Sequence, residues 1–151
     1  NDPFKLLHFQ QQIEQLAFTA GGGNLVAPAQ RMVDFVERRL SRDLPKNSYL
    51  PGTKSVELQE VLPARVNERL RKALPVFGKK MKGYYTNEAI LVGVESRTSS
   101  PVKVPRDKET LQHPQVAGLY PCAEGAGYAG GIISAAIDGI NCANAAITLL
   151  T

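Results

Sequence analysis

The sequence is short of the residues that usually build redox, metal and disulfide centres. It has no tryptophan, two cysteines and two histidines among 151 residues. Cys122 and Cys142 show neither CxxC nor Cys/His ligand spacing, so the sequence predicts neither a disulfide framework nor a metal site. His8 and His113 have no nucleophile beside them and are interpreted as surface residues. These residue types therefore identify no catalytic group.

Two further patterns were looked for in the sequence, a targeting segment at Asn1 and a glycine-rich phosphate-binding turn after a strand. The chain begins at Asn1 without a basic segment followed by an apolar core. We therefore expect part of a longer protein, no secretion signal, reduced cysteines and a cytoplasmic location. No GxGxxG turn follows a predicted strand. The run Gly21-Gly22-Gly23-Asn24 follows a predicted helix, so it is interpreted as a connection and not as a phosphate cradle.

The positive charge is concentrated in one stretch of the chain. A hydrophobic share of 43% and a charged share of 21% are typical of a folded globular protein, and the net charge is +4. Within residues 65–82, Glu68 is accompanied by seven basic residues: Arg65, Arg69, Arg71, Lys72, Lys79, Lys80 and Lys82. A solvated helix face is the preferred interpretation, because no nucleic-acid-binding motif or stacking aromatic pattern accompanies these charges. The alternative is a surface that binds nucleic acid or another polyanion.

The first part of the chain, residues 1–87, has mainly helical periodicity. Helices are predicted over residues 3–20, 28–40 and 55–62, and a longer one begins after Pro63. Pro75 lies late in this last pattern and predicts a kink or an early end.

The second part, residues 88–151, favours strands and one long helix. Aliphatic and β-branched residues predict short strands over residues 89–95, 102–104 and 116–121, followed by a helix over 129–149. The predicted class is therefore α/β, as an α+β fragment with a helical first part. Because the last helix is apolar on nearly every face, we expect it to be buried. A membrane span is the alternative, against which Asp138, Asn141 and Asn144 argue.

A glycine-rich turn lies between the last predicted strand and the final helix. Glu124 is followed by four glycines within seven residues, at positions 125, 127, 130 and 131. Glycines allow a ligand to approach the main chain, and the start of a helix presents backbone N–H groups to it. The Glu124 carboxylate can accept hydrogen bonds from ligand hydroxyls. The alternative is a tight turn with a structural role alone.

Several segments resemble one family of flavoproteins. GVESRTSSPV at 93–102, GLYP at 118–121 and EGAGYAGG at 124–131 resemble uncharacterised bacterial FAD-dependent dehydrogenases of the glutathione-reductase-type superfamily. The segments GGGN at 21–24 and APAQR at 27–31 are similar to the same family. The resemblance therefore covers nearly the whole chain.

The resemblance implies the C-terminal portion of an FAD-dependent oxidoreductase. Residues 1–87 would belong to the inserted substrate-side domain and residues 88–151 to the FAD-binding domain. Glu124 would bind the ribityl chain, and the segment from Arg97 through Thr98 to Ser100 would lie near the flavin or the substrate. The implied cofactor-binding residues are Glu124, Gly125, Ala126, Gly127, Tyr128, Ala129, Gly130, Gly131, Ile132, Arg97 and Ser99. Family members usually have glycine where this chain has Ala123.

The resemblance also implies what these residues lack. Without the N-terminal dinucleotide-binding part, we expect the 151 residues to bind FAD weakly or not at all and to be inactive alone. The partners would be that N-terminal part and an unknown small-molecule substrate, with no membrane and no nucleic acid. An ordinary salt bridge is the alternative for Arg97, and a small core side chain is preferred over a redox thiol for Cys122. A standalone anion-binding or nucleic-acid-binding module that uses residues 65–82 is the alternative function.

Overall fold

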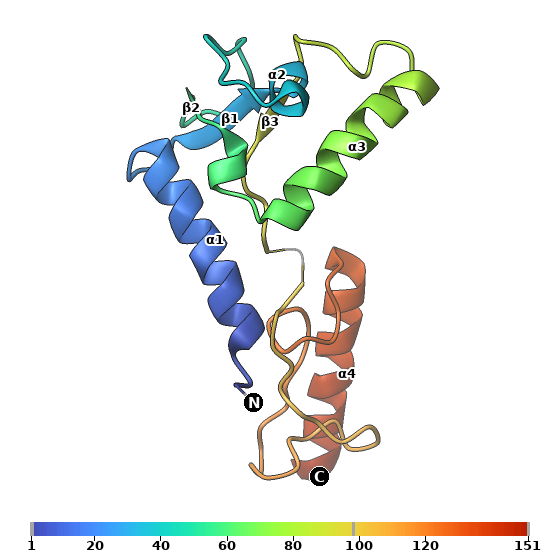
Figure 1. Cartoon of the computed structure of the whole chain (residues 1–151). Helices are drawn as coiled ribbons and strands as arrows, with labels where there is room; N and C mark the ends of the chain where they lie inside the picture. The colour runs from blue at the N-terminus through green and yellow to red at the C-terminus, as the bar shows by residue number, and fades with distance from the viewer. Residues whose placement is uncertain (1, 98, 151) are drawn as a thin grey trace. The chain divides into compact units, whose positions relative to one another are not determined.

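The computed structural model describes residues 2–97 and 99–150 and contains two compact units. Unit 1 comprises Asn1–Gln10 and Arg97–Thr151, and unit 2 comprises Gln11–Ser96. The described residues form four α-helices and one three-stranded mixed sheet (Figure 1). The mixed α/β class predicted from the sequence is therefore confirmed, whereas the functional boundary predicted after residue 87 stays a prediction.

The first helix, α1 (Lys5–Gly21), ends in an ordered glycine cap. The backbone N–H of Gly22 donates to Thr19 O at 3.0 Å, and that of Gly23 donates to Phe18 O at 2.8 Å. These are the two hydrogen bonds of a Schellman motif. Gly22 and Gly23 have φ values of +112° and +78°, a region that favours glycine. The glycine run is thus a helix end, in agreement with its interpretation as a connection.

The sheet lies in unit 2 and has the order β2-β1-β3. Its central strand β1 (Ala27–Arg31) pairs parallel to β2 (Thr53–Ser55) and antiparallel to β3 (Ile90–Val92). The strand expected within residues 89–95 is therefore present but shorter. The helix predicted over 28–40 is wrong in its first part, because the backbone of these residues pairs with two distant segments. Only α2 (Met32–Glu37) remains helical, and it ends where Arg38 adopts a left-handed conformation.

Two apolar clusters form the core of unit 2. One comprises Met32, Phe35, Leu58 and Leu74, and the other comprises Ala17, Val56 and Val61. The helix predicted over residues 55–62 is reduced to a 3₁₀ turn, η1 (Leu58–Glu60). The longer helix, α3 (Ala64–Lys80), continues through Pro75, so the early end predicted at this residue does not occur.

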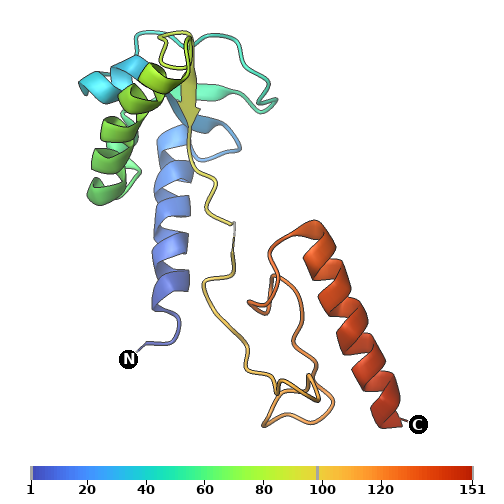
Figure 2. The same ribbon diagram turned by 90° about the vertical axis from the view of Figure 1, so that its right-hand side faces the viewer.

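Unit 1 contains no regular strand among its described residues. Figure 2 shows the chain beyond residue 99 as turns and bends that lead to α4 (Ile132–Leu150). The strand predicted over 102–104 is wrong, because Pro101 and Pro105 flank it and cannot donate to a ladder. The strand predicted over 116–121 is also wrong, because the chain turns where Leu119 N donates to Val116 O and Gly118 has a φ of +76°.

The expected burial of the last helix is also wrong. Ile132, Ile133 and Ile147 of α4 are 92%, 74% and 58% exposed. By length and composition, the stretch Ile132–Leu149 is long and apolar enough to cross a membrane, the one such helix in the described part of the chain. The prediction of an apolar helix is correct. The rest of unit 1, however, covers only the side of α4 that carries the buried Cys142.

Candidate functional site

A small cavity lies at the glycine-rich turn of unit 1. Its volume is about 160 Å³, and its lining residues are Ser99, Ser100, Glu124, Gly127, Tyr128, Ala129 and Gly130. The cavity brings the segment after residue 97 together with the turn that contains Glu124. Their role as a flavin site stays a prediction. Cavities that enclose a drug-sized ligand measure about 300–1,000 Å³. This cavity can therefore hold only part of a molecule as large as FAD.

The backbone of the turn is held by its own hydrogen bonds. Gly127 N donates to Glu124 O at 2.9 Å, and Tyr128 N donates to Ala123 O at 3.0 Å. Ala123 has a φ of +57°, which explains why glycine suits this position. Gly127 has a φ of +83°, and a Cβ on it would lie 2.8 Å from Val102 O. The missing side chain of Gly127 thus makes room for the protein's own backbone.

A half-buried arginine, Arg106, connects the turn to α4. Arg106 Nη2 donates to Asp138 Oδ1 at 2.6 Å and Arg106 Nη1 to Asp138 Oδ2 at 3.0 Å, and both side chains are largely buried. Arg106 Nη1 also donates to Pro121 O at 2.9 Å. The guanidinium carbon lies 3.7 Å from the centre of the Tyr128 ring, a cation–π contact. Tyr128 in turn donates its hydroxyl to Val104 O at 2.9 Å.

The same network sets the electrostatics beside the cavity. The hydrogen bond from Arg106 and a second from Ala123 N, at 2.8 Å, hold the pKa of the Asp138 carboxyl below its ordinary value. The hydrogen bond to Asp138 raises the pKa of Arg106. Both side chains are therefore charged at neutral pH. The Glu124 carboxylate is exposed, so it is open to a ligand.

The predicted cofactor residues divide into two groups. Six of them line the cavity: Ser99, Glu124, Gly127, Tyr128, Ala129 and Gly130. The others lie outside the lining, namely Arg97, Gly125, Ala126, Gly131 and Ile132. Arg97 is exposed. Ala126 is buried, and the Ala126 carbonyl accepts a hydrogen bond from Val104 N at 3.1 Å. Thr98 lies outside the described residues.

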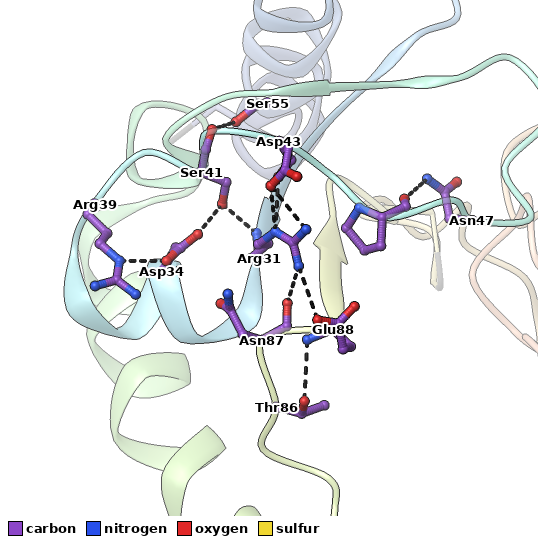
Figure 3. Close-up of polar contacts among 11 residues, drawn as sticks. Arg31, Asp34, Arg39, Ser41, Asp43, Asn47, Ser55, Thr86, Asn87 and Glu88 are labelled. Carbon is purple, nitrogen blue, oxygen red and sulfur yellow. Dashed lines mark hydrogen bonds and ion pairs between the residues drawn. The ribbon is translucent and has the colours of Figure 1, made fainter.

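Unit 2 has a polar cluster of its own, which surrounds Arg31, the last residue of the APAQR segment (Figure 3). Arg31 Nη1 donates to Asn87 O at 2.6 Å, and Nη2 donates to Asp43 Oδ1 at 3.0 Å. Nε donates to Asp43 O at 3.0 Å, and Glu88 forms an ion pair at 3.8 Å. The guanidinium thus joins the loop after α2 to the loop before β3. No role for this arginine could be predicted from the sequence, because its partners are distant along the chain.

The buried Asp34 completes this cluster. Arg39 and Ser41 both donate to its carboxylate, and Ser41 Oγ also accepts from Arg31 N at 2.8 Å. Burial raises the pKa of Asp34, but the hydrogen bonds from Arg39 and Ser41 outweigh this effect and lower it. A cavity of about 440 Å³ adjoins the cluster, lined by Arg31, Asp34, Arg39, Leu40, Arg42, Asp43, Asn87 and Glu88. Three arginines and three acids offset each other there, which points to a structural clamp.

The basic stretch 65–82 lies mainly on the exposed side of α3. Six of its basic residues are exposed: Arg65, Arg69, Lys72, Lys79, Lys80 and Lys82. Arg71 differs, because its Nε donates to Phe35 O at 2.9 Å and its guanidinium lies over the Phe35 ring. These positions agree with a solvated helix face. The absence of nucleic-acid binding stays a prediction.

Two comparisons with known proteins extend this description. A family model described as "FAD-dependent protein, C-terminal domain-like" matches residues 1–98. An uncharacterized protein of Clostridium beijerinckii is 48% identical over 145 residues, which are 95% of this chain and 27% of that relative. The chain thus spans about a quarter of the relative's length. The family match ends before the turn at Glu124, whereas the match to the relative covers nearly the whole chain.

Proposed function

The chain belongs to the FAD-dependent protein, C-terminal domain-like family, and on this premise we propose that it is the C-terminal part of an FAD-dependent oxidoreductase. In this proposal the turn from Glu124 to Gly131 contacts the cofactor. The observation that carries the proposal is the cavity at this turn, where Glu124 lies beside Ser99 and Ser100. Carboxylate, hydroxyl and backbone groups meet there.

The lining residues suit the polar part of the cofactor. The Glu124 carboxylate can accept hydrogen bonds from ribityl hydroxyls, and the Ser99 and Ser100 hydroxyls can both donate and accept. α4 begins at Ile132, two residues after Gly130, which lines the cavity. The positive end of the α4 helix dipole is therefore close in the chain to the cavity lining. Bound FAD would supply the hydride and electron chemistry, and the protein would supply position and electrostatics.

We propose that a preceding dinucleotide-binding part supplies the remaining contacts. Two observations support this. The cavity of about 160 Å³ is too small for the whole cofactor, and the chain corresponds to 27% of its relative. The exposed isoleucines of α4 have the character of a surface that another part of the protein covers, because large exposed apolar patches mark interaction sites.

The flavin content of two purified proteins tests the proposal. One is the longer protein that includes the preceding sequence, and the other is the 151-residue chain, each mixed with excess FAD and then freed of unbound cofactor. We expect the longer protein to retain about one FAD per chain and the 151-residue chain to retain little. A longer protein that releases all of its FAD would refute the proposal. A 151-residue chain with stoichiometric FAD would refute the need for the preceding part.

A further inference from the structure

The two cysteines, which are distant in the sequence, meet at one place in unit 1. Asp138 and Cys142 are one turn apart on α4 and therefore share a face. Pro121 O accepts from Cys142 Sγ at 3.9 Å, and Ala123 N donates to Asp138 Oδ2 at 2.8 Å. Both neighbours of Cys122 are thus bonded to this face of α4. Cys122 is also among the neighbours that raise the pKa of the Cys142 thiol.

The surroundings give the two thiols different properties. Cys122 is partly exposed, whereas Cys142 is 3% exposed, and both are free. Burial raises the pKa of the Cys142 thiol, the charge of Arg106 opposes this shift, and Asp138 and Cys122 add to it. Arg106 Nη1 lies 3.3 Å from Cys142 Sγ, where a cation stabilises a developing thiolate. A solvent oxidant therefore meets Cys122 first, and Cys142 is placed to react second.

We propose that Cys122 and Cys142 form a dithiol pair that a peroxide oxidises to an intramolecular disulfide. In the first step the Cys122 sulfur attacks the peroxide, an S–O bond forms, the O–O bond breaks and water leaves. In the second step the Cys142 sulfur attacks the Cys122 sulfur, so that an S–S bond forms and the S–O bond breaks. The departing hydroxide takes the Cys142 proton and leaves as water. Two thiols are oxidised and one peroxide is reduced to two waters.

The proposal does not depend on flavin binding. The disulfide would join the segment directly before Ala123 and Glu124 to the middle of α4, close to the Arg106–Asp138 ion pair. It would thus reinforce a connection that hydrogen bonds already make. Reduction by a dithiol would restore both thiols, because thiolate attack on a disulfide sulfur is reversible.

Non-reducing peptide mapping of the 151-residue chain after treatment with hydrogen peroxide tests the pair. Remaining thiols are alkylated before digestion. The expected product is a peptide in which Cys122 is linked to Cys142 and which dithiothreitol separates. Sulfinic acid or an intermolecular disulfide at Cys122, with Cys142 still a free thiol, would overturn the proposal. The same peroxide dose in concentrated guanidinium chloride is expected to form the pair at least about tenfold more slowly, because the thiols are no longer held together. Equal rates would overturn it.

Two variants test the order of the steps. In Cys142→Ala, we expect a sulfenic acid at Cys122 that persists long enough for dimedone to trap it, because the second thiol is missing. In Cys122→Ala, we expect Cys142 to remain reduced at the dose that oxidises the parent chain. Oxidation of Cys142 in Cys122→Ala at the parent rate would contradict the assigned order and thereby the proposal. The wild-type peptide map gives an answer even if either substitution impairs folding.

Discussion

At Ala123 the backbone adopts a φ of +57°, and this residue's amide donates to Asp138. A left-handed conformation costs a residue with a Cβ about 1–2 kcal/mol, and glycine would relieve this strain in the folded chain. Glycine also makes the unfolded chain more flexible, which reduces the gain in stability by about 0.4–1 kcal/mol. We therefore expect Ala123→Gly to raise the free energy of unfolding by about 0.5–1 kcal/mol in urea denaturation. The control is Ala135→Gly in α4, which we expect to lower it by about 1 kcal/mol. Equal losses from both substitutions would contradict the argument.

Gly127 and Gly125 have opposite steric surroundings in the same turn. A Cβ on Gly127 would lie 2.8 Å from Val102 O and 3.1 Å from Lys103 Cα, whereas nothing lies within 4 Å of a Cβ on Gly125. We expect Gly127→Ala to destabilise the chain by about 1–3 kcal/mol and Gly125→Ala to change its stability by less than about 0.5 kcal/mol. Thermal unfolding of both variants measures this. If Gly127→Ala unfolds like the parent chain, the close packing of the turn is wrong.

Among the elements, α4 depends on a charge pair that acid should break. The lowered pKa of Asp138 means that the folded chain binds its proton less readily than the unfolded chain does. The Asp138 carboxylate therefore stabilises the folded chain fully above the ordinary carboxyl pKa of about 3.9. This stabilisation is lost as the pH falls through the lower pKa that Asp138 has in the folded chain. We expect Asp138→Asn to lower the free energy of unfolding by about 1–3 kcal/mol at neutral pH.

The pH dependence of that difference is the informative measurement. Asp34 and Asp107 also have lowered pKa values, so the parent chain alone loses stability in acid for several reasons. The difference between parent and Asp138→Asn isolates one carboxylate. We expect it to be constant above about pH 5 and to shrink below about pH 4. A difference of the same size at pH 3 and pH 7 would contradict the role of the charged carboxylate.

The loops beside β1 depend in the same way on Arg31. Its planar guanidinium bonds Asp43 and Asn87 simultaneously, and a lysine amine cannot reproduce that geometry. We expect Arg31→Lys to cost about 1–3 kcal/mol in the free energy of unfolding and to speed amide hydrogen exchange in residues 39–43 and 86–88. Arg42→Lys is the matched control, because Arg42 lines the same cavity and is exposed. Similar effects of both substitutions would show that the clamp is not specific to Arg31.

Elements governed by local patterns could be predicted from the sequence, and those governed by distant pairing could not. α1 and α3 have helical periodicity, and β3 lies inside the predicted strand. β1 was missed because its pairing with β2 and β3 involves segments far along the chain, and that pairing outweighs a local helical pattern. The strand expected over 102–104 failed because two prolines flank it.

The same division applies to the candidate site. Glu124 and its glycines could be named from an acid before a glycine run, and the cavity places Ser99 beside them. The pairing of Arg106 with Asp138 could not be predicted, because no local pattern links these residues. The proximity of Cys122 to Cys142 was hidden for the same reason. Local patterns detect residues that act together where they are close in the chain, whereas Ser99 was linked to Glu124 by the family resemblance.

For the whole molecule, the two units are stabilised in different ways. Unit 2 has apolar clusters around Phe35 and Val61, whereas a polar network around Arg106 connects the turns of unit 1 to α4. The exposed apolar surface of α4 fits a unit that completes its core with another part of the protein. This is the physical reason why we propose that the chain works within a longer flavoprotein and not alone.

The affinity of the longer protein for FAD after the substitution Glu124→Ala is the measurement that tests this proposal most directly. A hydrogen bond to a charged group contributes about 1.5–3 kcal/mol, so we expect the affinity to fall about tenfold to a hundredfold. Thermal unfolding of the apo protein should be unchanged, because Glu124 is exposed. The control is Glu109→Ala, another exposed carboxylate of unit 1, which should leave the affinity as it is. Unchanged affinity in Glu124→Ala, or a loss only in proportion to unfolding, would show that this turn is not the flavin contact.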